Sequence, residues 1–463
     1  MRLRAIATLL TAVALAGDVA AKRPPFELNK SFGTKTAYWD QSRRETNAIK
    51  QFVQELSREE ESKYTLVQVQ QVVRHGTRFP TDGNMAEIQD LVKRLQANYS
   101  SIPKWLQSYQ TPYNVSIEGT LAPNGVTELV EFASRTRAAV GNNVLPNSFS
   151  AEKFILQHTY KSRTKDSAIA FASKFFSNPS EVKYIEYGKK DDYLLRFYDR
   201  CPRYERDVLN NPTALIEVQR FSESPVMQKN VETLRAKLKL PASASLSVKD
   251  VASAWSACAF DLALFKRTDN WCTLMTPELV KSVEYLEDLS EFYEESHGYK
   301  INYEIASLLL RDIVKYMRDS AEGKTQIVGN FRFAHGETTT PLLTLLGYMD
   351  SKKLLASFTP EMIDARRFRM AKAGPFMANI EFRLYNRSVA VNTDGEESPQ
   401  QQQQQQRPQP TKTTVEKFYV QIRVNEQVTI VPGCDSEIFC ELSEFEQIHD
   451  FYLHQFDFAA ACT

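Results

Sequence analysis

The sequence lacks an excess of charge of either sign, and this absence narrows the classes of partner. Among its 463 residues, 57 lysines and arginines balance 57 aspartates and glutamates, so the formal net charge is zero. A protein that binds nucleic acid through a broad surface carries a strong positive excess. We therefore expect no nucleic-acid partner, and any preference for anions must come from a local cluster of cations.

The sequence also lacks long hydrophobic runs and the common cofactor motifs. No stretch approaches the roughly 18 consecutive apolar residues that favour a transmembrane helix, so no membrane span is expected. The six histidines show no His-Glu-x-x-His pattern and no clustering with cysteine, so we expect no metal site. There is no P-loop, dinucleotide-binding glycine motif or Gly-x-Ser-x-Gly elbow. These absences disfavour a metal-dependent or serine hydrolase, and we expect no cofactor.

The first 21 residues have the pattern of a secretory signal. Arg2 and Arg4 precede a short apolar run from Leu9 to Ala16, and small residues near Ala21 offer cleavage positions. Six cysteines form an even set, as expected for disulfides in an oxidising compartment. The sequence therefore predicts a secreted protein or a resident of an endomembrane lumen. N-glycans are expected at some of the four sequons, which begin at Asn29, Asn98, Asn114 and Asn386.

The cysteine spacing suggests one set of disulfides among many possible ones. Cys434 and Cys440 can close a small loop, and Cys258 with Cys272 can join a helical hairpin. That choice leaves Cys201 for Cys462. Spacing alone does not decide among the connectivities that six cysteines allow.

Three units of a strand, a short loop and a helix follow one another along the chain. The predicted strands cover residues 64–73, 153–157 and 326–334, and helical patterns follow within residues 85–95 and 167–176. After the third strand, three threonines with Pro341 in the first turn predict the start of a helix that contains the leucines of 342–346. These units predict an α/β fold with a mostly parallel central sheet flanked by helices. Ligands bind such sheets beyond the carboxyl ends of the strands. His75, Arg163 and His335 all lie at those ends.

Two later stretches depart from this pattern. Residues 180–298 show helical spacing and few strands, which predicts an α-helical cap inserted into the sheet domain. Alternating apolar residues at 380–384 and 418–424 predict paired antiparallel strands. Residues 392–414 between them include seven consecutive glutamines and predict a disordered surface loop. The predicted organisation is a signal peptide (1–21), an N-terminal arm (22–62), a first core part (63–179), the cap (180–298) and a second core part (299–463).

The strongest chemical signal is a heptapeptide that follows the first predicted strand: Arg74-His75-Gly76-Thr77-Arg78-Phe79-Pro80. Arginine presents a planar fork of donors that suits a phosphate dianion, so Arg74 and Arg78 are candidate phosphate ligands. Two neighbouring guanidinium groups favour the neutral form of His75, which a nucleophile requires. Each residue alone could be a surface arginine or a core histidine. The combination favours a phosphate site.

Three residues farther along the chain complete the candidate site. Arg163 stands near a predicted helix start, where the helix dipole opposes a cation unless an anion lies between them. His335 can donate to a phosphoryl oxygen, and a protonated Glu337 can deliver a proton to a departing alkoxide. The alternative for Glu337 is an ordinary acidic residue at a helix N-terminus. From the residues alone we predict hydrolysis of a phosphomonoester through a phosphorylated His75.

These motifs resemble those of the histidine acid phosphatases, branch 2 of the histidine phosphatase superfamily, which includes phytases and inositol polyphosphate phosphatases. The resemblance implies an α/β core with a helical cap, a phosphohistidine at His75 and a proton donor at Glu337. It implies that Arg74, Arg78, Arg163 and His335 bind the phosphate; the implied substrates are inositol hexakisphosphate and lower inositol phosphates. Phytases usually carry His-Asp at the second motif, and the inositol polyphosphate subgroup carries His-Ala-Glu, so glycine at position 336 is a departure.

Two other readings remain open. One is a broad-specificity histidine acid phosphatase, and the other is a non-catalytic secreted protein that binds anions. A highly anionic substrate would need further cations around the pocket. The candidates are Lys161, Lys165, Arg366 and Arg367, which could equally be ordinary solvated charges.

Overall fold

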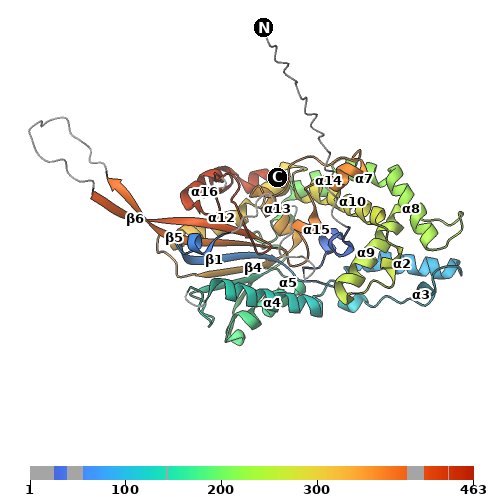
Figure 1. Ribbon diagram of the computed structural model, residues 1–463, viewed down its shortest axis with the longest axis horizontal. Coiled ribbons are helices and arrows are strands. Elements are labelled where there is room, and N and C mark those ends of the chain that lie inside the picture. The colour runs from blue at the N-terminus through green and yellow to red at the C-terminus, as the bar shows by residue number, and fades with distance from the viewer. Residues whose placement is uncertain (1–25, 39–55, 142–143, 394–410, 436) are drawn as a thin grey trace, which may run out of the picture.

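Figure 1 shows the computed structural model of the protein, in which a long sheet lies beside a group of helices. The structure describes residues 26–38, 56–141, 144–393, 411–435 and 437–463. The predicted signal peptide and the run of glutamines lie outside these residues. Among the described helices, none combines the length and the apolar composition that a bilayer crossing requires.

One mixed sheet joins the strands of the described residues in the order β3-β2-β4-β1-β5-β6-β7, with β8 also paired to β6. The strands are β1 (Thr65–Arg74), β2 (Phe154–His158), β3 (Tyr184–Glu186), β4 (Gly329–Ala334), β5 (Asn379–Thr393), β6 (Thr411–Val424), β7 (Gln427–Thr429) and β8 (Cys440–Glu441). The first four in this order are parallel, and the remaining pairings are antiparallel. The α/β class is confirmed, with a sheet that is parallel in one half and antiparallel in the other.

Strand β1 lies where the two halves of the sheet meet. Its last seven residues are buried, as its valine-rich sequence predicts. Its carboxyl end pairs with both neighbours, through Arg74 opposite Ala334 of β4 and Val73 opposite Asn379 of β5. The residue that follows β1 therefore emerges in the middle of the sheet rather than at an edge strand.

The antiparallel pair β5–β6 confirms the strands expected from alternation. Ile380 lies opposite Val424, and Phe382 lies opposite Ile422. Both strands extend farther than expected, to Thr393 and from Thr411, so the predicted loop at 392–414 was too long at both ends. The extensions are rich in β-branched residues, which suit a pleated strand, and the polar composition near the glutamines concealed them.

Helices cover both faces of the sheet. On one face, α4 (Pro123–Val140) and α5 (Ser162–Phe175) pack on a cluster that includes Val69, Val73 and Phe331. On the other face, α12 (Ser307–Ala321) and α13 (Gly336–Leu345) pack on a cluster that includes Val72 and Ile380. The sheet is therefore buried between two helical layers in its parallel half, which accounts for the apolar strands there.

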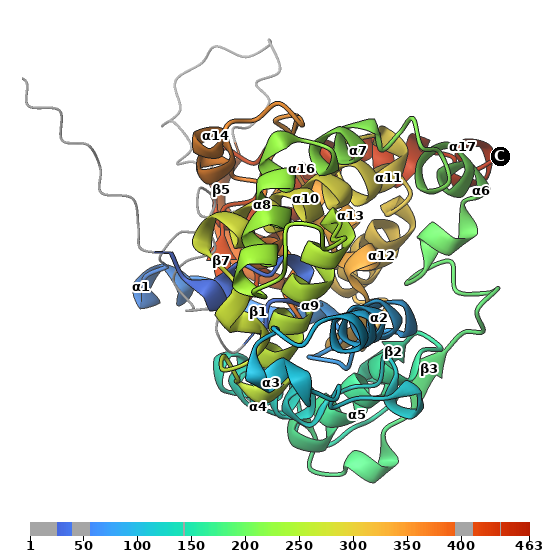
Figure 2. The same ribbon diagram turned by 90° about the vertical axis from the view of Figure 1, so that its right-hand side faces the viewer.

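Most of the remaining helices form the group beside the sheet in Figure 2, where α8, α9 and α10 pack side by side. The helices of residues 180–298 are α6 (Pro202–Tyr204), α7 (Ile216–Ser222), α8 (Pro225–Lys237), α9 (Val248–Phe265) and α10 (Pro277–Glu295). Helix α2 (Asp82–Asn98), from an earlier part of the chain, also packs against α9. The helical part is thus assembled from two stretches of sequence.

The shorter helices complete the fold. They are α1 (Arg58–Glu61), α3 (Lys104–Gln107), α11 (Lys300–Glu304), α14 (Pro360–Ala365), α15 (Met370–Ala373), α16 (Leu442–Ile448) and α17 (Phe458–Ala461).

Two helices begin earlier than their sequences predict. Helix α5 begins at Ser162 rather than near residue 167, and α13 begins at Gly336, so Pro341 lies inside it rather than in its first turn. Glycine and threonine have low helix propensity, and this concealed the start of α13. Burial of the threonines overrides propensity there, and the Thr338 hydroxyl donates to the Leu195 carbonyl at 2.7 Å.

The three disulfides suggested by spacing are all present. They are Cys201–Cys462, Cys258–Cys272 and Cys434–Cys440. The first joins residues 261 positions apart in the sequence and fastens the chain near α17 to the start of α6.

Candidate active site

His75 follows the last residue of β1 and is held by the backbone on both sides. Its N–H donates to the carbonyl of Ala334 at 3.0 Å, and its carbonyl accepts from the N–H of Met377 at 3.0 Å. The imidazole Nδ1 lies 3.0 Å from the Gly76 carbonyl, which can only accept, so Nδ1 carries the proton. The lone pair of the ring is therefore on Nε2, the atom that can attack an electrophile.

The surroundings of His75 keep the imidazole neutral. Burial lowers its pKa well below the usual range, and the positive charges of Arg163, Arg74 and Arg78 lower it further. A neutral imidazole has a lone pair available at neutral and at mildly acidic pH. The protonation state and the tautomer thus both suit a nucleophile.

Arg74 and Arg78 share an aromatic support. The Arg74 guanidinium carbon lies 5.0 Å from the ring centre of Phe376, and that of Arg78 lies 5.9 Å away. Burial lowers the pKa of Arg78 to about 9, and the positive charges of Arg163 and Arg74 add to this effect. The Nε atoms of both side chains are buried without a hydrogen-bond partner among the described residues. Clustered cations with unused donors are the chemistry that an oxyanion satisfies.

Arg163, from the first turn of α5, meets His335 at the end of β4. Its Nη2 lies 3.4 Å from His335 Nδ1, and the two histidine rings, of His75 and His335, are 5.7 Å apart between centres. A guanidinium can only donate, so His335 Nδ1 accepts from Arg163 and the ring proton is on Nε2. This Nε2–H lies 2.9 Å from the Thr159 hydroxyl, measured from the nitrogen, and can donate to it. Burial lowers the pKa of His335 well below its usual range, and the positive charge of Arg163 lowers it further.

Glu337 lies in the first turn of α13, next to these cations. Its charge partly offsets the pKa decrease that burial causes at Arg74 and Arg163. A Cβ at position 336 would lie 3.6 Å from Arg74 Nε, an ordinary contact, so alanine would fit here as well as glycine. The departure from His-Ala-Glu therefore does not reflect a lack of space at this position.

Several residues that support the heptapeptide gave no signal in the sequence. The Glu128 carboxylate accepts from the Thr77 N–H at 2.8 Å and from its hydroxyl at 2.7 Å, and the Ser167 hydroxyl accepts from the Gly76 N–H at 3.2 Å. A Cβ on Gly76 would lie 2.7 Å from the Gly125 carbonyl, so the backbone of the motif touches α4 directly. These contacts join residues that are far apart along the chain, and only the fold brings them together.

Of the four additional cation candidates, the two arginines have carboxylate partners, whereas the two lysines lie close to Arg163 in the sequence. Arg366 is buried and pairs with Asp288 at 2.7 Å, and Arg367 lies 3.3 Å from Asp350, so both already have carboxylate partners. Lys161 is partly buried beside Tyr160, and Lys165 is exposed on α5.

Arg196 is a cation near the site that we did not predict. Its guanidinium carbon lies 5.1 Å from the ring centres of both Tyr160 and Tyr198, and its charge contributes to the low pKa of His335.

Helix α10 carries two carboxyl groups, those of Glu291 and Glu295, whose charges interact with Arg74. Burial raises the pKa of Glu291 to about 8, and the charges of Glu294 and Glu287 raise it further, while Arg74 opposes them. Burial also raises the pKa of Glu295 well above its usual range. Glu291 is therefore neutral at pH 7 and becomes negative above about pH 8.

This titration predicts how phosphate inhibition depends on pH. Above about pH 8 the charged Glu291 adds repulsion near Arg74, so inorganic phosphate should bind more weakly than it would beside a neutral side chain. We expect Glu291→Gln to match the unsubstituted protein at pH 6.5 and to bind phosphate about threefold more tightly than it at pH 9. Inhibition constants at the two pH values measure this, and an equal ratio at both would contradict it.

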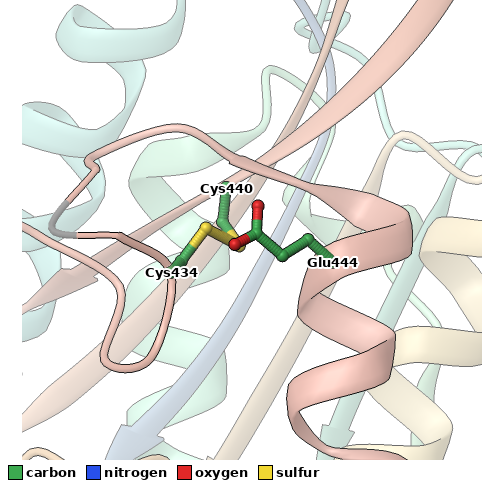
Figure 3. Close-up of side chains that lie close together, drawn as sticks. All are labelled: Cys434, Cys440 and Glu444. Atoms are coloured by element: carbon green, nitrogen blue, oxygen red, sulfur yellow. A yellow bond between two sulfur atoms is a disulfide. The ribbon is translucent and has the colours of Figure 1, made fainter.

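One group of metal-ligating residue types gathers in the part of the chain that the structure describes. Cys434, Cys440 and Glu444 place one potential ligand atom each within 4.8 Å of one another. Figure 3 shows the Glu444 carboxylate, from α16, beside the disulfide of the two cysteines. Disulfide sulfurs are not thiolates, so this group does not form a cysteine-ligated site in the oxidised protein.

The structure brings the sequence-predicted site residues from three separate stretches, at 74–78, 163 and 335–337, to the carboxyl ends of β1, β2 and β4. The guanidinium groups of Arg74, Arg78 and Arg163 gather around His75, whose Nε2 carries a lone pair, so fold and site together define a phosphate-handling hydrolase of the α/β class. Residues 65–425 match the family model of the histidine phosphatase superfamily (branch 2), and the chain belongs to this family. It is a phosphatase.

The chain is similar to two relatives over most of its length. It is 28% identical over 454 residues to multiple inositol polyphosphate phosphatase 1 of Homo sapiens, covering 91% of this chain and 87% of the human protein. It is 29% identical over 370 residues to the Gallus gallus protein of the same name, covering 78% and 76%.

Among solved structures, the phytase from D. castellii matches with a TM-score of 0.73 at 17% identity, over 98% of this chain and 92% of that chain. The Bifidobacterium longum multiple inositol polyphosphate phosphatase in complex with inositol hexasulfate matches with a TM-score of 0.63 at 14% identity, over 90% and 97%. At these identities the likeness shows the fold.

Proposed function

We propose that the protein hydrolyses inositol polyphosphates through a phosphohistidine intermediate at His75. The observation that carries the proposal is the tautomer of His75, whose Nδ1 donates to Gly76 and whose Nε2 is left free beside three guanidinium groups. Arg74, Arg78 and Arg163 hold the phosphoryl oxygens. His335 joins them when its Nε2–H turns from the Thr159 hydroxyl to a phosphoryl oxygen.

The first step transfers the phosphoryl group to the enzyme. The Nε2 lone pair of His75 attacks phosphorus, and the bond from phosphorus to the alcohol oxygen breaks. The Glu337 carboxyl gives its proton to that oxygen, so the alcohol leaves neutral and Glu337 becomes a carboxylate. The arginines stabilise the charge on the equatorial oxygens throughout.

The second step releases phosphate. The Glu337 carboxylate takes a proton from water, the water oxygen attacks phosphorus, and the bond from phosphorus to His75 Nε2 breaks. His75 returns to the neutral tautomer, Glu337 is protonated again, and one water molecule has been consumed per phosphate.

The names of the relatives support inositol phosphates as the substrate class. We expect faster phosphate release from inositol hexakisphosphate than from p-nitrophenyl phosphate at equal low concentration, so that kcat/KM values are compared. If only the aryl ester is hydrolysed, the protein is instead the broad-specificity acid phosphatase that the sequence left open. If neither is hydrolysed, the non-catalytic anion-binding alternative stands.

We also propose that the protein is secreted or enters an endomembrane lumen, which the three disulfides support. Asn98 and Asn114 are exposed, whereas Asn386 is half-buried in β5 and paired with β1 and β6. When the protein is expressed in a eukaryotic secretory host, glycopeptide mapping should find glycans at Asn98 and Asn114 and none at Asn386. Unmodified Asn98 and Asn114 in secreted material would contradict this.

A further inference from the structure

Residues 26–38 precede both β1 and the region matched by the family model, yet they lie against the active site. We call them the N-terminal strap. They form two short 3-10 turns, at Leu28–Lys30 and Gly33–Lys35. Ser31, Phe32, Thr36 and Ala37 are buried. Part of the segment that the sequence predicts as an N-terminal arm is therefore built into the interior.

The strap contacts the Arg74 side chain directly. Arg74 Nη1 donates to the Thr34 carbonyl at 2.7 Å and to the Gly374 carbonyl at 2.6 Å. Two carbonyl acceptors on one amino group fix the orientation of the planar guanidinium. Because Nη1 is engaged in this way, the edge of the guanidinium formed by Nε and Nη2 is the part that can face an anion.

The strap also holds the aromatic support of the arginines. The N–H of Phe376 donates to the Thr36 carbonyl at 3.0 Å, and the Phe376 ring lies beneath both Arg74 and Arg78. The next residue, Met377, donates its N–H to the His75 carbonyl. The Thr34 carbonyl of the strap therefore contacts Arg74, and the Thr36 carbonyl holds the segment at Phe376, which in turn contacts Arg78 and His75.

Both ends of the strap are anchored to different parts of the fold. On the helical side, Phe32 packs against Trp255 with ring centres 5.3 Å apart, and Lys35 Nζ lies 2.7 Å from the Glu287 carboxylate of α10. On the sheet side, the Tyr38 hydroxyl donates to Glu426 at 2.9 Å and accepts from Asn379 at 3.2 Å. Anchors on both sides hold the Thr34 and Thr36 carbonyls in place between them.

We propose that the N-terminal strap is a positioning element of the phosphate site, with the Thr34 carbonyl orienting Arg74 and the Thr36 carbonyl orienting Phe376. This inference rests on the proposed role of Arg74 in binding phosphate. Burial lowers the pKa of Arg74, which agrees with a guanidinium that depends on a few protein acceptors in place of water. Misplacing the strap should weaken phosphate binding more than it slows turnover at saturating substrate.

Two substitutions displace the strap carbonyls without touching the proposed phosphate ligands. Gly33 has a φ of +51° with room for a Cβ, 3.7 Å from its nearest neighbour, so Gly33→Ala strains the backbone next to Thr34 and creates no clash. Lys35→Met removes the ion pair with Glu287 that anchors the strap to α10, so the neighbouring Thr34 and Thr36 carbonyls can shift. The matched control is Lys417→Met, which removes a Lys–Glu pair of the same 2.7 Å length at β6 and β8.

The measurement is the inhibition constant of inorganic phosphate, together with KM and kcat, on the full-length protein. We expect the inhibition constant to rise about tenfold in Gly33→Ala and by a smaller factor in Lys35→Met, with kcat within about twofold. Lys417→Met should change neither. Loss of stability alone would lower the active fraction and the apparent kcat and would leave the phosphate inhibition constant unchanged.

Arg74→Ala separates this inference from the function on which it rests. If Arg74→Ala weakens phosphate binding and the strap variants do not, the strap inference is wrong and the proposed site stands. If Arg74→Ala leaves phosphate binding unchanged, the proposed role of Arg74 is wrong. Should Gly33→Ala fail to fold, Lys35→Met decides the outcome.

Discussion

His75→Ala should reduce phosphate release from every substrate by about 10⁴-fold or more, because no other group can take the place of the attacking nitrogen. The reason lies in the geometry: Nδ1 is committed to the Gly76 carbonyl, and the neighbouring His335 has both ring nitrogens in contact with Arg163 and Thr159. Steady-state phosphate release measures the loss.

His158 offers a matched control for this substitution. It ends β2 as His75 follows β1, it is buried, and its Nδ1 lies 2.9 Å from the carbonyl of the next residue, Thr159. His158→Ala removes the same kind of side chain from the neighbouring part of the sheet and should retain most of the activity. Near-normal turnover in His75→Ala would rule out the covalent route.

Trapping experiments test the intermediate itself. Rapid acid-free quenching with labelled substrate should leave label on the unsubstituted protein that survives alkali and is lost in acid, as a phosphoramidate is. The label should be absent from His75→Ala and present in His158→Ala. Label of the same stability on His75→Ala would place the nucleophile elsewhere.

Glu337→Gln should slow the hydrolysis of alkyl phosphates by about 10²- to 10³-fold, because an alkoxide leaves poorly without a proton and an amide cannot supply one. An aryl phosphate with an acidic phenol needs little protonation, so its phosphoryl transfer to His75 should be slowed far less. The substitution keeps the size of the side chain at the start of α13 and leaves the arginines in place.

The dependence on leaving group is the internal control for this prediction. A series of aryl and alkyl phosphates should give a steeper plot of the transfer rate against leaving-group pKa for Glu337→Gln than for the unsubstituted protein. Single-turnover rates are required, because dephosphorylation of His75 also uses Glu337 and can limit steady-state turnover. Equal slopes in the two proteins would mean that another group donates the proton.

The sequence predicted the elements of the sheet well where burial leaves a local pattern. The apolar run before His75 and the alternation at 380–384 both reflect which faces of the strands are buried, and that information is local. The starts of α5 and α13 were missed because burial of Thr164 and Thr338 stabilises turns that their own propensities disfavour.

The supporting residues of the site could not be predicted from the sequence for a different reason. Glu128, Thr34 and Phe376 act through one or two hydrogen bonds or one ring face, at positions far from the heptapeptide along the chain. Any glutamate or any backbone carbonyl could serve as an acceptor, so residue type carries no information. The chemical motif predicts which groups react, and only the fold shows what holds them.

The Cys201–Cys462 link sets a problem of timing for the nascent chain. Cys462 is synthesised 261 residues after Cys201, and the other four cysteines emerge from the ribosome in the interval. Thiolate exchange can join Cys201 to any of them before its native partner exists. Correct oxidation therefore depends on Cys258 and Cys272, only 14 residues apart, closing quickly upon each other, or on an isomerase that reopens mistaken bridges.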